Sequence, residues 1–348
     1  DYIKAVDETI LYDSLLSAVM EWISLVAIAG VLWYGGGQVL QQSLTFGTLV
    51  AFIQYAQRLF DPIRQLGERF TSIQSGFTAV ERISSILDTP IEVKDPTEPL
   101  ALPVDGGGEI RFEGVWFGYK PDEWVLKDVT FTIAPGQTVA LVGPTGSGKS
   151  TIIRLLSRLY EPQRGTITID GVDIRRITQD ELRRRIGVIL QEGFLFSGDI
   201  KSNIALGEDY SLAEIERAAR TMNVDAFIRD LPQGYDTSVR ERGNNLSGGQ
   251  KQLLAFARAA VRNPRILVLD EATASLDVGT EALVQEALSR LLVGRTCVII
   301  AHRLSTIRNV DRILVLKNGE LIEDGNHEHL LSRGGLYATL YRLQALAA

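Results

Sequence analysis

The sequence has little of what several classes of site require. Among its 348 residues there is one cysteine and there are three histidines. A single cysteine excludes a disulfide framework within the chain and a zinc cluster built on cysteines. Three histidines leave little material for a histidine-rich metal site. Positive charge is also scarce, because 36 basic residues face 43 acidic ones and the formal net charge is −7. We therefore expect no nucleic acid as a partner.

The composition is that of a folded protein. Hydrophobic residues make up 45% and charged residues 23% of the sequence, which excludes intrinsic disorder and collagen-like order. At roughly 100 to 200 residues per domain, the length predicts about two structural units. No charged-then-apolar signal sequence precedes the first apolar segment, and the first residue is Asp1. We expect the sequence to be a piece of a longer polypeptide.

One long segment carries no charge at all. It runs from Trp22 to Gln57, a stretch of 36 positions. A helical membrane span needs roughly 20 residues, so this run exceeds one span and falls short of two. The three glycines at 35–37, followed by Gln38, Gln41, Gln42 and Ser43, predict a polar break. We expect a helical hairpin with spans near residues 15–34 and 48–66.

Polar side chains mark one face of the second expected span. They recur at spacings of three and four, which places them on one side of a helix; they are Gln54, Gln57, Arg58, Asp61 and Gln65. Polar groups at membrane depth usually face protein or a watery cavity. In the alternative interpretation, Arg58 and Arg64 only extend their charged ends to the cytoplasmic membrane–water interface. Pro62 predicts a kink, and Trp22 and Trp33 are either interfacial anchors or packed core residues.

A change of character follows the apolar segment. Four prolines between residues 90 and 103, and the glycines 106–108, predict a linker without regular structure. After Glu109, short β-rich runs alternate with helical stretches, which is typical of a sheet flanked by helices. We therefore predict three parts: a membrane segment over 1–88, a linker over 89–108 and an α/β domain over 109–348.

The α/β domain contains a phosphate-binding loop. Residues 143–151 match the Walker A pattern G-x-x-x-x-G-K-[ST], after an expected strand Thr138–Val142 and before an expected helix Ser150–Leu159. The glycines allow backbone N–H groups to close around phosphate oxygens. Lys149 would reach the β- and γ-phosphates, and the Ser150 hydroxyl would bind Mg²⁺. The predicted nucleotide-binding residues of this loop are Gly143, Pro144, Thr145, Gly146, Ser147, Gly148, Lys149, Ser150 and Thr151.

Two further motifs fit a site for ATP and Mg²⁺. An apolar run over 266–269 predicts a buried strand that ends at Asp270, which would hold hydrated Mg²⁺, and Glu271 is placed to polarise the attacking water. About a hundred residues after the Walker A loop comes the sequence Leu246-Ser247-Gly248-Gly249-Gln250. A Ser-Gly-Gly that opens a helix offers a second phosphate-binding surface, although by itself it could be an ordinary helix cap.

With these three motifs in this order, the chain resembles the ATP-binding cassette (ABC) transporters. The resemblance covers essentially the whole chain and is to the exporter branch, in which membrane and nucleotide-binding domains share one polypeptide. It implies that residues 109–348 are a complete nucleotide-binding domain with the α/β P-loop NTPase fold. It also implies that residues 1–88 are only the last two helices of an all-α, six-helix transmembrane domain.

The resemblance assigns roles to residues outside these motifs. Tyr119 matches the aromatic residue that stacks on adenine, and Gln191 matches the glutamine that senses Mg²⁺ and the γ-phosphate. Asp277 falls in the loop that crosses a dimer interface, and His302 matches the histidine that contacts the γ-phosphate. Residues 241–243 resemble the segment that touches the coupling helices of the membrane domain.

The resemblance also implies a mechanism and partners. In this family the signature of one nucleotide-binding domain faces the Walker A loop of another, so each ATP needs a second half-transporter subunit, identical or related. Hydrolysis by Glu271, with Lys149, Gln191 and His302, would drive export of an amphipathic, drug-like or lipid-like substrate. The surrounding membrane lipid would be that of a prokaryotic plasma membrane, with the nucleotide-binding domain on the cytoplasmic side.

Other interpretations stay open at this point. A soluble ABC ATPase would share the nucleotide motifs, but the uncharged run argues against it. An ATP-gated channel or regulator would share both features. His327 and His329 form an H-x-H pattern in what we expect to be a polar turn, and no third metal ligand lies nearby in sequence.

Overall fold

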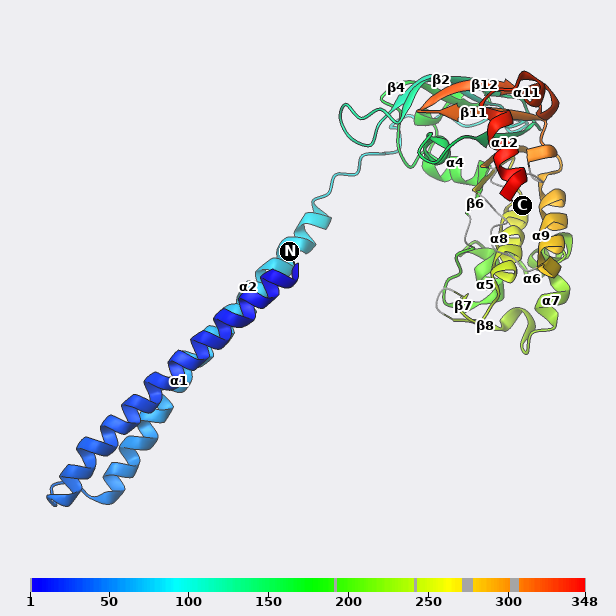
Figure 1. Cartoon of the computed structure of the whole chain (residues 1–348). Helices are drawn as coiled ribbons and strands as arrows, with labels where there is room; N and C mark the ends of the chain where they lie inside the picture. The colour runs from blue at the N-terminus through cyan, green and yellow to red at the C-terminus, as the bar shows by residue number, and fades with distance from the viewer. Residues whose placement is uncertain (1, 191–192, 241–242, 271–277, 301–306, 348) are drawn as a thin grey trace. The chain divides into compact units, whose positions relative to one another are not determined.

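The computed structural model describes residues 2–190, 193–240, 243–270, 278–300 and 307–347 (Figure 1). The chain divides into two compact units, Asp1–Ile91 and Glu92–Ala348. Of the expected site residues, Gln191, Glu271, Asp277 and His302 lie outside the described residues, as do residues 241 and 242 of the expected coupling segment.

The first unit is a helical hairpin of α1 (Tyr2–Leu40) and α2 (Phe46–Leu87). The expected polar break falls in its second half: α1 continues through the glycines 35–37 to Leu40, and the chain turns at 41–45, which includes Gln41, Gln42 and Ser43. Glycine weakens a helix but still donates its backbone hydrogen bond, so it does not by itself end one. Gly35 has a packing role: a Cβ there would lie 2.6 Å from Cδ1 of Leu49, a buried residue of α2. The small residue therefore allows the two helices to approach closely.

Only part of this hairpin has the composition of a membrane span. Among the described residues, the segment Ile10–Leu40 of α1 is the one stretch long and apolar enough to cross a membrane. The second expected span falls within α2, whose helix is assigned without interruption through Pro62. Gln54, Gln57 and Arg58 are exposed there, and such polar side chains lower the hydropathy of the segment.

The described residues of the second unit form two large sheets and a two-stranded antiparallel sheet of β7 (Gly198–Asp199) and β8 (Ser238–Val239). A six-stranded sheet has the order β12-β11-β3-β10-β9-β6, in which only β12 is antiparallel to its neighbour. Its strands are β3 (Thr138–Val142), β6 (Ile186–Ile189), β9 (Ile266–Asp270), β10 (Thr296–Ile300), β11 (Arg312–Lys317) and β12 (Glu320–Gly325). A four-stranded antiparallel sheet has the order β2-β1-β4-β5, from β1 (Ile110–Phe117), β2 (Leu126–Ile133), β4 (Arg164–Ile169) and β5 (Val172–Asp173).

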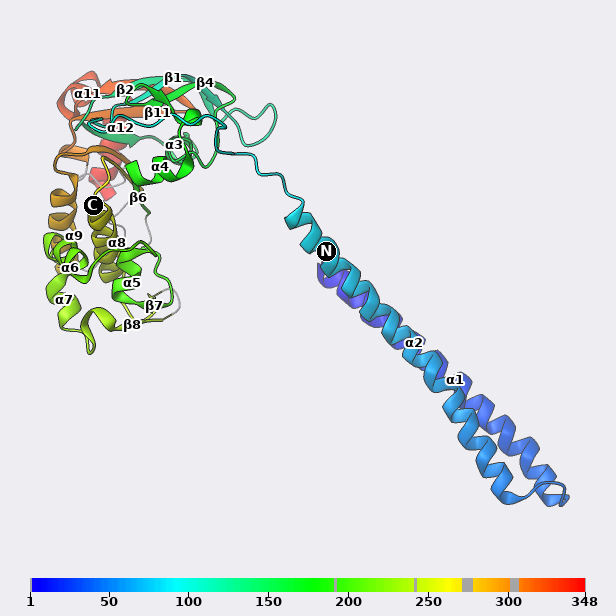
Figure 2. The same ribbon diagram turned by 180° about the vertical axis from the view of Figure 1, so that it is seen from behind.

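Helices cover both faces of the six-stranded sheet (Figures 1 and 2). The remaining described elements are α3 (Lys149–Leu156), η1 (Ile174–Arg176), α4 (Gln179–Arg185), α5 (Ile200–Ala205), α6 (Leu212–Thr221), α7 (Asp225–Arg229), η2 (Gly234–Asp236), α8 (Gly248–Arg262), α9 (Val278–Leu292), α11 (His327–Arg333) and α12 (Leu336–Ala347). The views show α5 to α9 grouped together, away from the β1–β2–β4 sheet.

The core lies in two apolar clusters, one on each face of the six-stranded sheet. Successive residues of β3 alternate between them, as the two-residue repeat of a strand requires. Val139 and Leu141 pack with α3, α4 and the four-stranded sheet, whereas Ala140 and Val142 pack with α5 to α9. These residues are almost fully buried, so the apolar run of β3 is explained by burial on both faces.

This topology brings the motifs to one edge of the sheet. β3, β6, β9 and β10 run parallel, so their carboxyl ends lie along the same edge, where ligands of open α/β sheets bind. The Walker A loop follows β3, and Asp270 ends β9. An α/β domain preceded by an all-helical segment is therefore confirmed as the fold class.

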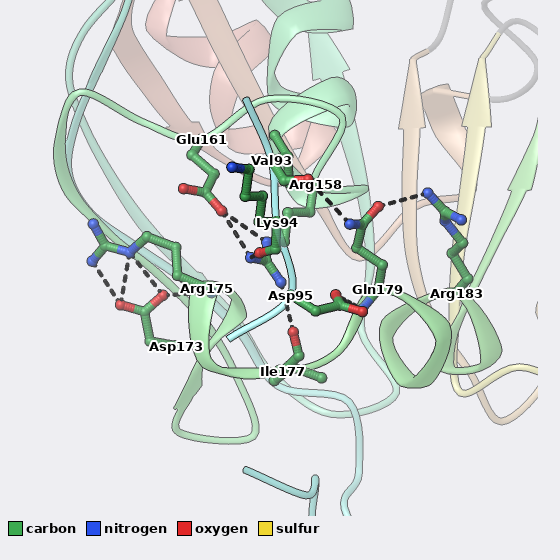
Figure 3. A network of polar contacts seen from close by, with 10 residues as sticks. All are labelled: Val93, Lys94, Asp95, Arg158, Glu161, Asp173, Arg175, Ile177, Gln179 and Arg183. Carbon is green, nitrogen blue, oxygen red and sulfur yellow. Dashed lines mark hydrogen bonds and ion pairs between the residues drawn. The ribbon is translucent and has the colours of Figure 1, made fainter. Parts of the chain in front are cut away.

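The segment expected to be a linker is bound to the second unit at Val93, Lys94 and Asp95 (Figure 3). The buried guanidinium of Arg158 donates from Nη2 to the Lys94 carbonyl (2.7 Å), from Nη1 to the Ile177 carbonyl (2.6 Å) and from Nε to Glu161 Oε1 (2.9 Å). The backbone N–H of Gln179 donates to Asp95 Oδ1 (2.8 Å) at the start of α4. Residues from Glu92 onward thus pack as part of this unit.

Candidate nucleotide-binding site

The Walker A loop connects β3 to α3. Gly146 and Gly148 have φ values of +80° and +104°, a region that favours glycine. A Cβ at Gly148 would also lie 2.5 Å from Cδ2 of Leu126 in the neighbouring sheet. The loop geometry therefore requires glycine at these positions.

The side chain of a buried lysine contacts this loop. Lys149 is buried, with an exposed fraction of 7%, and its Nζ donates to the carbonyls of Gly143 (2.8 Å) and Pro144 (2.9 Å). The hydroxyl oxygen of Ser147 is buried without a hydrogen-bond partner among the described residues. An orphaned hydroxyl, a buried ammonium group and the N-terminus of α3 together fit an anionic, oxygen-rich ligand.

A tyrosine lies on the side of α3 that faces the four-stranded sheet. Tyr119 follows β1, and its exposed fraction is 42%. The preceding residue, Gly118, is bound twice by the Gln163 side chain: Nε2 donates to the Gly118 carbonyl (2.7 Å) and Oε1 accepts from its N–H (3.1 Å). The tyrosine ring packs edge-on against Phe117 and Tyr160, with ring centroids 4.9 and 5.2 Å away. These contacts hold the backbone beside the tyrosine and pack two aromatic rings against its own ring.

The hydroxyl of Tyr119 meets the helix of the Walker A motif. It lies 3.2 Å from Oγ1 of Thr151 and accepts a 3.0 Å hydrogen bond from Nη1 of Arg154. Thr151 belongs to the predicted loop, so the structure brings Tyr119 and the Walker A motif together. A cavity of about 430 Å³ adjoins this tyrosine; it is lined by Glu92, Val93, Phe117, Gly118, Tyr119, Lys120, Pro121, Asp122, Trp124, Tyr160, Glu161 and Gln163.

Asp270 lies at the same sheet edge. It is partly exposed at the end of β9, in register with Ile300 of β10, and β10 also pairs with β3. With strands about 4.8 Å apart, two steps across the sheet separate Asp270 from the Walker A strand by about 10 Å. The hydroxyl oxygen of Ser150 and the carboxylate of Asp270 are the hard oxygen donors that Mg²⁺ prefers, together with waters and phosphate oxygens. The residues present therefore fit this ion.

The signature residues begin α8. Ser247 caps the helix: its Oγ accepts from the N–H of Gln250 (3.2 Å), and Gln250 Oε1 accepts from the N–H of Ser247 (2.8 Å). Ser247 and Gly248 are exposed, whereas Gly249 is buried. The hydrogen bonds of this motif stay within its own turn, so the structure does not join it to the Walker A loop of the same chain.

Three residues of the site, Arg154, Tyr160 and Gln163, belong to none of the sequence motifs. The sequence gives only weak signals for their place in the site. Arg154 lies three residues after Thr151, a spacing that shares a helix face. Tyr160 and Gln163 follow α3 in an irregular segment, so their packing against Tyr119 depends on tertiary structure.

The H-x-H pattern has a structural explanation. His327 begins α11 rather than lying in a turn, because Asn326 caps that helix. Nδ1 of His327 lies 2.6 Å from the Tyr337 hydroxyl. Within the described residues, no group of three or more His, Cys, Asp or Glu side chains could hold a metal ion.

This arrangement of a parallel sheet, a glycine-rich loop and a buried lysine defines a P-loop nucleotide-binding domain. Comparison with known proteins gives the family. Residues 126–274 match the sequence model of the family described as ABC transporter. The chain therefore belongs to the ABC transporter family and carries its ATPase domain.

Similar proteins extend over nearly the whole chain. The chain is 44% identical over 333 residues to an ATP-dependent lipid A-core flippase of Syntrophus aciditrophicus, covering 95% of the chain and 55% of that protein. It is 44% identical over 329 residues to a fatty acid ABC transporter ATP-binding/permease protein of Mycobacterium bovis, covering 94% and 52%. A solved structure of a bacterial Atm1-family ABC exporter with ATP bound is 42% identical, with a TM-score of 0.71, covering 99% of this chain and 59% of that one. The chain spans about half to three-fifths of the length of the relatives it matches.

Proposed function

We propose that this chain is the C-terminal part of an ABC exporter half-transporter, which uses ATP to export an amphipathic, drug-like or lipid-like substrate. The observation that carries the proposal is the Walker A loop, with Lys149 buried beneath it, in a chain that also has the apolar helix α1. The similarity to a lipid A-core flippase and to a fatty acid transporter favours a lipid-like substrate.

The proposed nucleotide handling uses residues that the structure describes. Lys149 pairs with the β- and γ-phosphates, whose charged oxygens are stronger acceptors than the neutral loop carbonyls that it contacts in this structure. Backbone N–H groups at the start of α3 bind the remaining phosphate oxygens. Tyr119 stacks on adenine. Mg²⁺, when bound by Ser150 and Asp270, neutralises phosphate charge.

The proposed hydrolysis needs residues from two subunits. Glu271 polarises water, and Gln191 and His302 contact the γ-phosphate. The exposed start of α8 offers its N-terminal partial positive charge to the ATP of a second subunit. The loop at Asp277 crosses between the subunits, and the partner is either an identical or a related chain.

We propose that residues 1–88 form the last two helices of the transmembrane domain, with spans near 15–34 and 48–66, before a linker over 89–108 and the nucleotide-binding domain over 109–348. Large apolar side chains cover α1, among them Trp22 and Trp33 with exposed fractions of 70% and 86%. Such a surface needs lipid or further helices to cover it. The prokaryotic plasma membrane is the proposed location, with the nucleotide-binding domain in the cytoplasm.

Reconstitution tests this function. The full-length protein is placed in lipid vesicles with its nucleotide-binding domain outward, and uptake of a fluorescent lipid or an amphipathic dye is followed after ATP is added. We expect uptake by the wild type and none by a Lys149→Met variant. ATP hydrolysis without ATP-dependent movement of any such probe would favour a channel or regulator. Absence of ATP hydrolysis would contradict the proposal.

A further inference from the structure

Arg154 belongs to none of the nucleotide-binding motifs, yet it contacts Tyr119, the residue proposed to stack on the adenine base. It lies one turn into α3, and its Nη1 donates to the Tyr119 hydroxyl at 3.0 Å. Its guanidinium carbon is 5.7 Å from the centroid of the tyrosine ring. Thr151, on the same face of α3, lies on the other side of that hydroxyl at 3.2 Å. The hydroxyl therefore has two partners, and both come from the Walker A helix.

The rest of Tyr119 is held by other elements. Gln163 fixes the backbone of Gly118, and the rings of Phe117 and Tyr160 meet the tyrosine ring edge-on, with interplanar angles of 88° and 85°. These contacts hold the backbone and the ring of the side chain. The hydroxyl contacts add two points of attachment at the far end of the ring, and both lie on α3. Even so, 42% of the residue stays exposed, so surface is left for a ligand.

We propose that Arg154 is a positioning residue for the nucleotide base. With Thr151 it holds the Tyr119 hydroxyl, so that the helix whose N-terminus receives the phosphates also sets the orientation of the ring that receives the base. This inference rests on the proposed function, in which Tyr119 stacks on adenine. It adds a residue that neither the motifs nor the family resemblance assigns.

A single rigid element then determines the distance between the two ends of the nucleotide site. The ring is oriented before the nucleotide arrives, so less conformational freedom is lost on binding. The charge of Arg154 could alternatively act directly on phosphates, and the contact could also be a surface interaction without a role in binding. These three possibilities differ in which ligand loses affinity, and in whether the loss depends on the tyrosine hydroxyl.

Calorimetric titration of the full chain with ATP and with inorganic tripolyphosphate separates them. Tripolyphosphate carries the phosphates without a base. The variants are Arg154→Met, Tyr119→Phe, which keeps the ring and removes the hydroxyl, and the double variant. Arg164→Met is the matched control, because Arg164 is an exposed arginine that lies against the rings of Trp116 and Trp124 and has no contact with Tyr119. Arg154→Lys retains a donor for the hydroxyl.

We expect Arg154→Met and Tyr119→Phe each to raise the Kd for ATP about three- to tenfold, which is the size of one lost hydrogen bond. The double variant should be no worse than either single one, and Arg154→Lys should recover part of the loss. The Kd for tripolyphosphate, and the Kd of Arg164→Met for ATP, should stay unchanged.

Three results would overturn the inference: an unchanged Kd for ATP in Arg154→Met, an equal loss of affinity for tripolyphosphate, or additive effects in the double variant. Because the readout is binding, a wild type that binds ATP without hydrolysing it would contradict the proposed function and leave this comparison intact. A wild type that binds no ATP would contradict both.

Discussion

Single residues at the nucleotide edge divide into those that the local sequence defines and those that depend on their neighbours. The lysine of the Walker A motif has a fixed place because β3 and α3 flank its loop closely, so its position followed from spacing alone. The contact between Arg154 and Tyr119 joins residues 35 positions apart. A contact between such distant residues exists only because the β1–β2 sheet packs on α3, and no spacing rule contains that information.

Cys297 gives a prediction at this scale. It is fully buried in β10, and burial raises the pKa of its thiol from 9.0 to about 12. The neutral thiol is a poor nucleophile. We expect a maleimide reagent to leave Cys297 unmodified at pH 8 in the folded protein and to modify it after denaturation; mass spectrometry measures this. Rapid labelling of the folded protein would contradict the burial of this thiol.

The same pKa predicts a dependence of stability on pH. The unfolded thiol ionises near pH 9.0 and the folded one near pH 12, so the unfolded chain releases this proton first. The contribution of Cys297 to the free energy of unfolding therefore falls as pH rises from 9 to 12. In a Cys297→Ala variant, this part of the pH dependence should be absent.

Elements show where sequence patterns decide structure and where packing overrides them. The strand Thr138–Val142 appears with the predicted bounds, because its four apolar residues after Thr138 are buried on both faces and have few alternatives. The predicted break between the two helices occurs at its glutamines, Gln41 and Gln42, whereas the glycines 35–37 lie within α1. Composition therefore indicated a turn in this region but not its exact position, and the space that Gly35 leaves for Leu49 of α2 was not visible in the sequence.

The segment between the two units gives a stability prediction. Arg158 is buried, with an exposed fraction of 3%, and binds two carbonyls and Glu161. We expect Arg158→Met to lower the free energy of unfolding by about 3 kcal/mol, because it leaves these acceptors without their partner. Chemical denaturation followed by tryptophan fluorescence measures the change.

The matched control for Arg158→Met is Arg184→Met. Arg184 forms an ion pair with Asp180, and the side chains are 65% and 74% exposed. Exposed pairs contribute little, so this control should stay within about 0.5 kcal/mol of the wild type. Equal losses in the two variants would show that Arg158 does not fasten the linker segment.

The start of α8 allows helix capping to be separated from phosphate binding. Ser247 caps this helix, and aspartate caps helices as well as serine does. We expect Ser247→Asp to keep the thermal stability of the wild type but to lose most ATP hydrolysis, because its carboxylate repels phosphate. Ser247→Ala should cost about 1 kcal/mol of stability. Full hydrolysis by Ser247→Asp would mean that this turn is a cap and nothing more.

At the scale of the whole molecule, the sequence predicted the fold class and the order of the motifs, because each motif lies next to a strand or helix with a clear period. It did not predict that the residues from Glu92 onward pack as part of the second unit. The prolines and glycines there correctly indicate an irregular backbone. Whether an irregular segment is free or bound depends on partners such as Arg158 and Gln179, which lie more than 60 residues further along the chain.

The central claim is that the chain hydrolyses ATP as half of a dimer, with Glu271 as the residue that activates water. The most direct test measures ATP hydrolysis by the purified full-length protein over a range of concentrations, beside a Glu271→Gln variant. We expect the specific activity to fall on dilution as the dimer dissociates. We also expect the variant to bind ATP normally but to turn it over at least about a hundredfold more slowly, a loss typical of removing one group that acts in the transition state. Hydrolysis of ATP by Glu271→Gln at the wild-type rate would show that Glu271 does not activate the water.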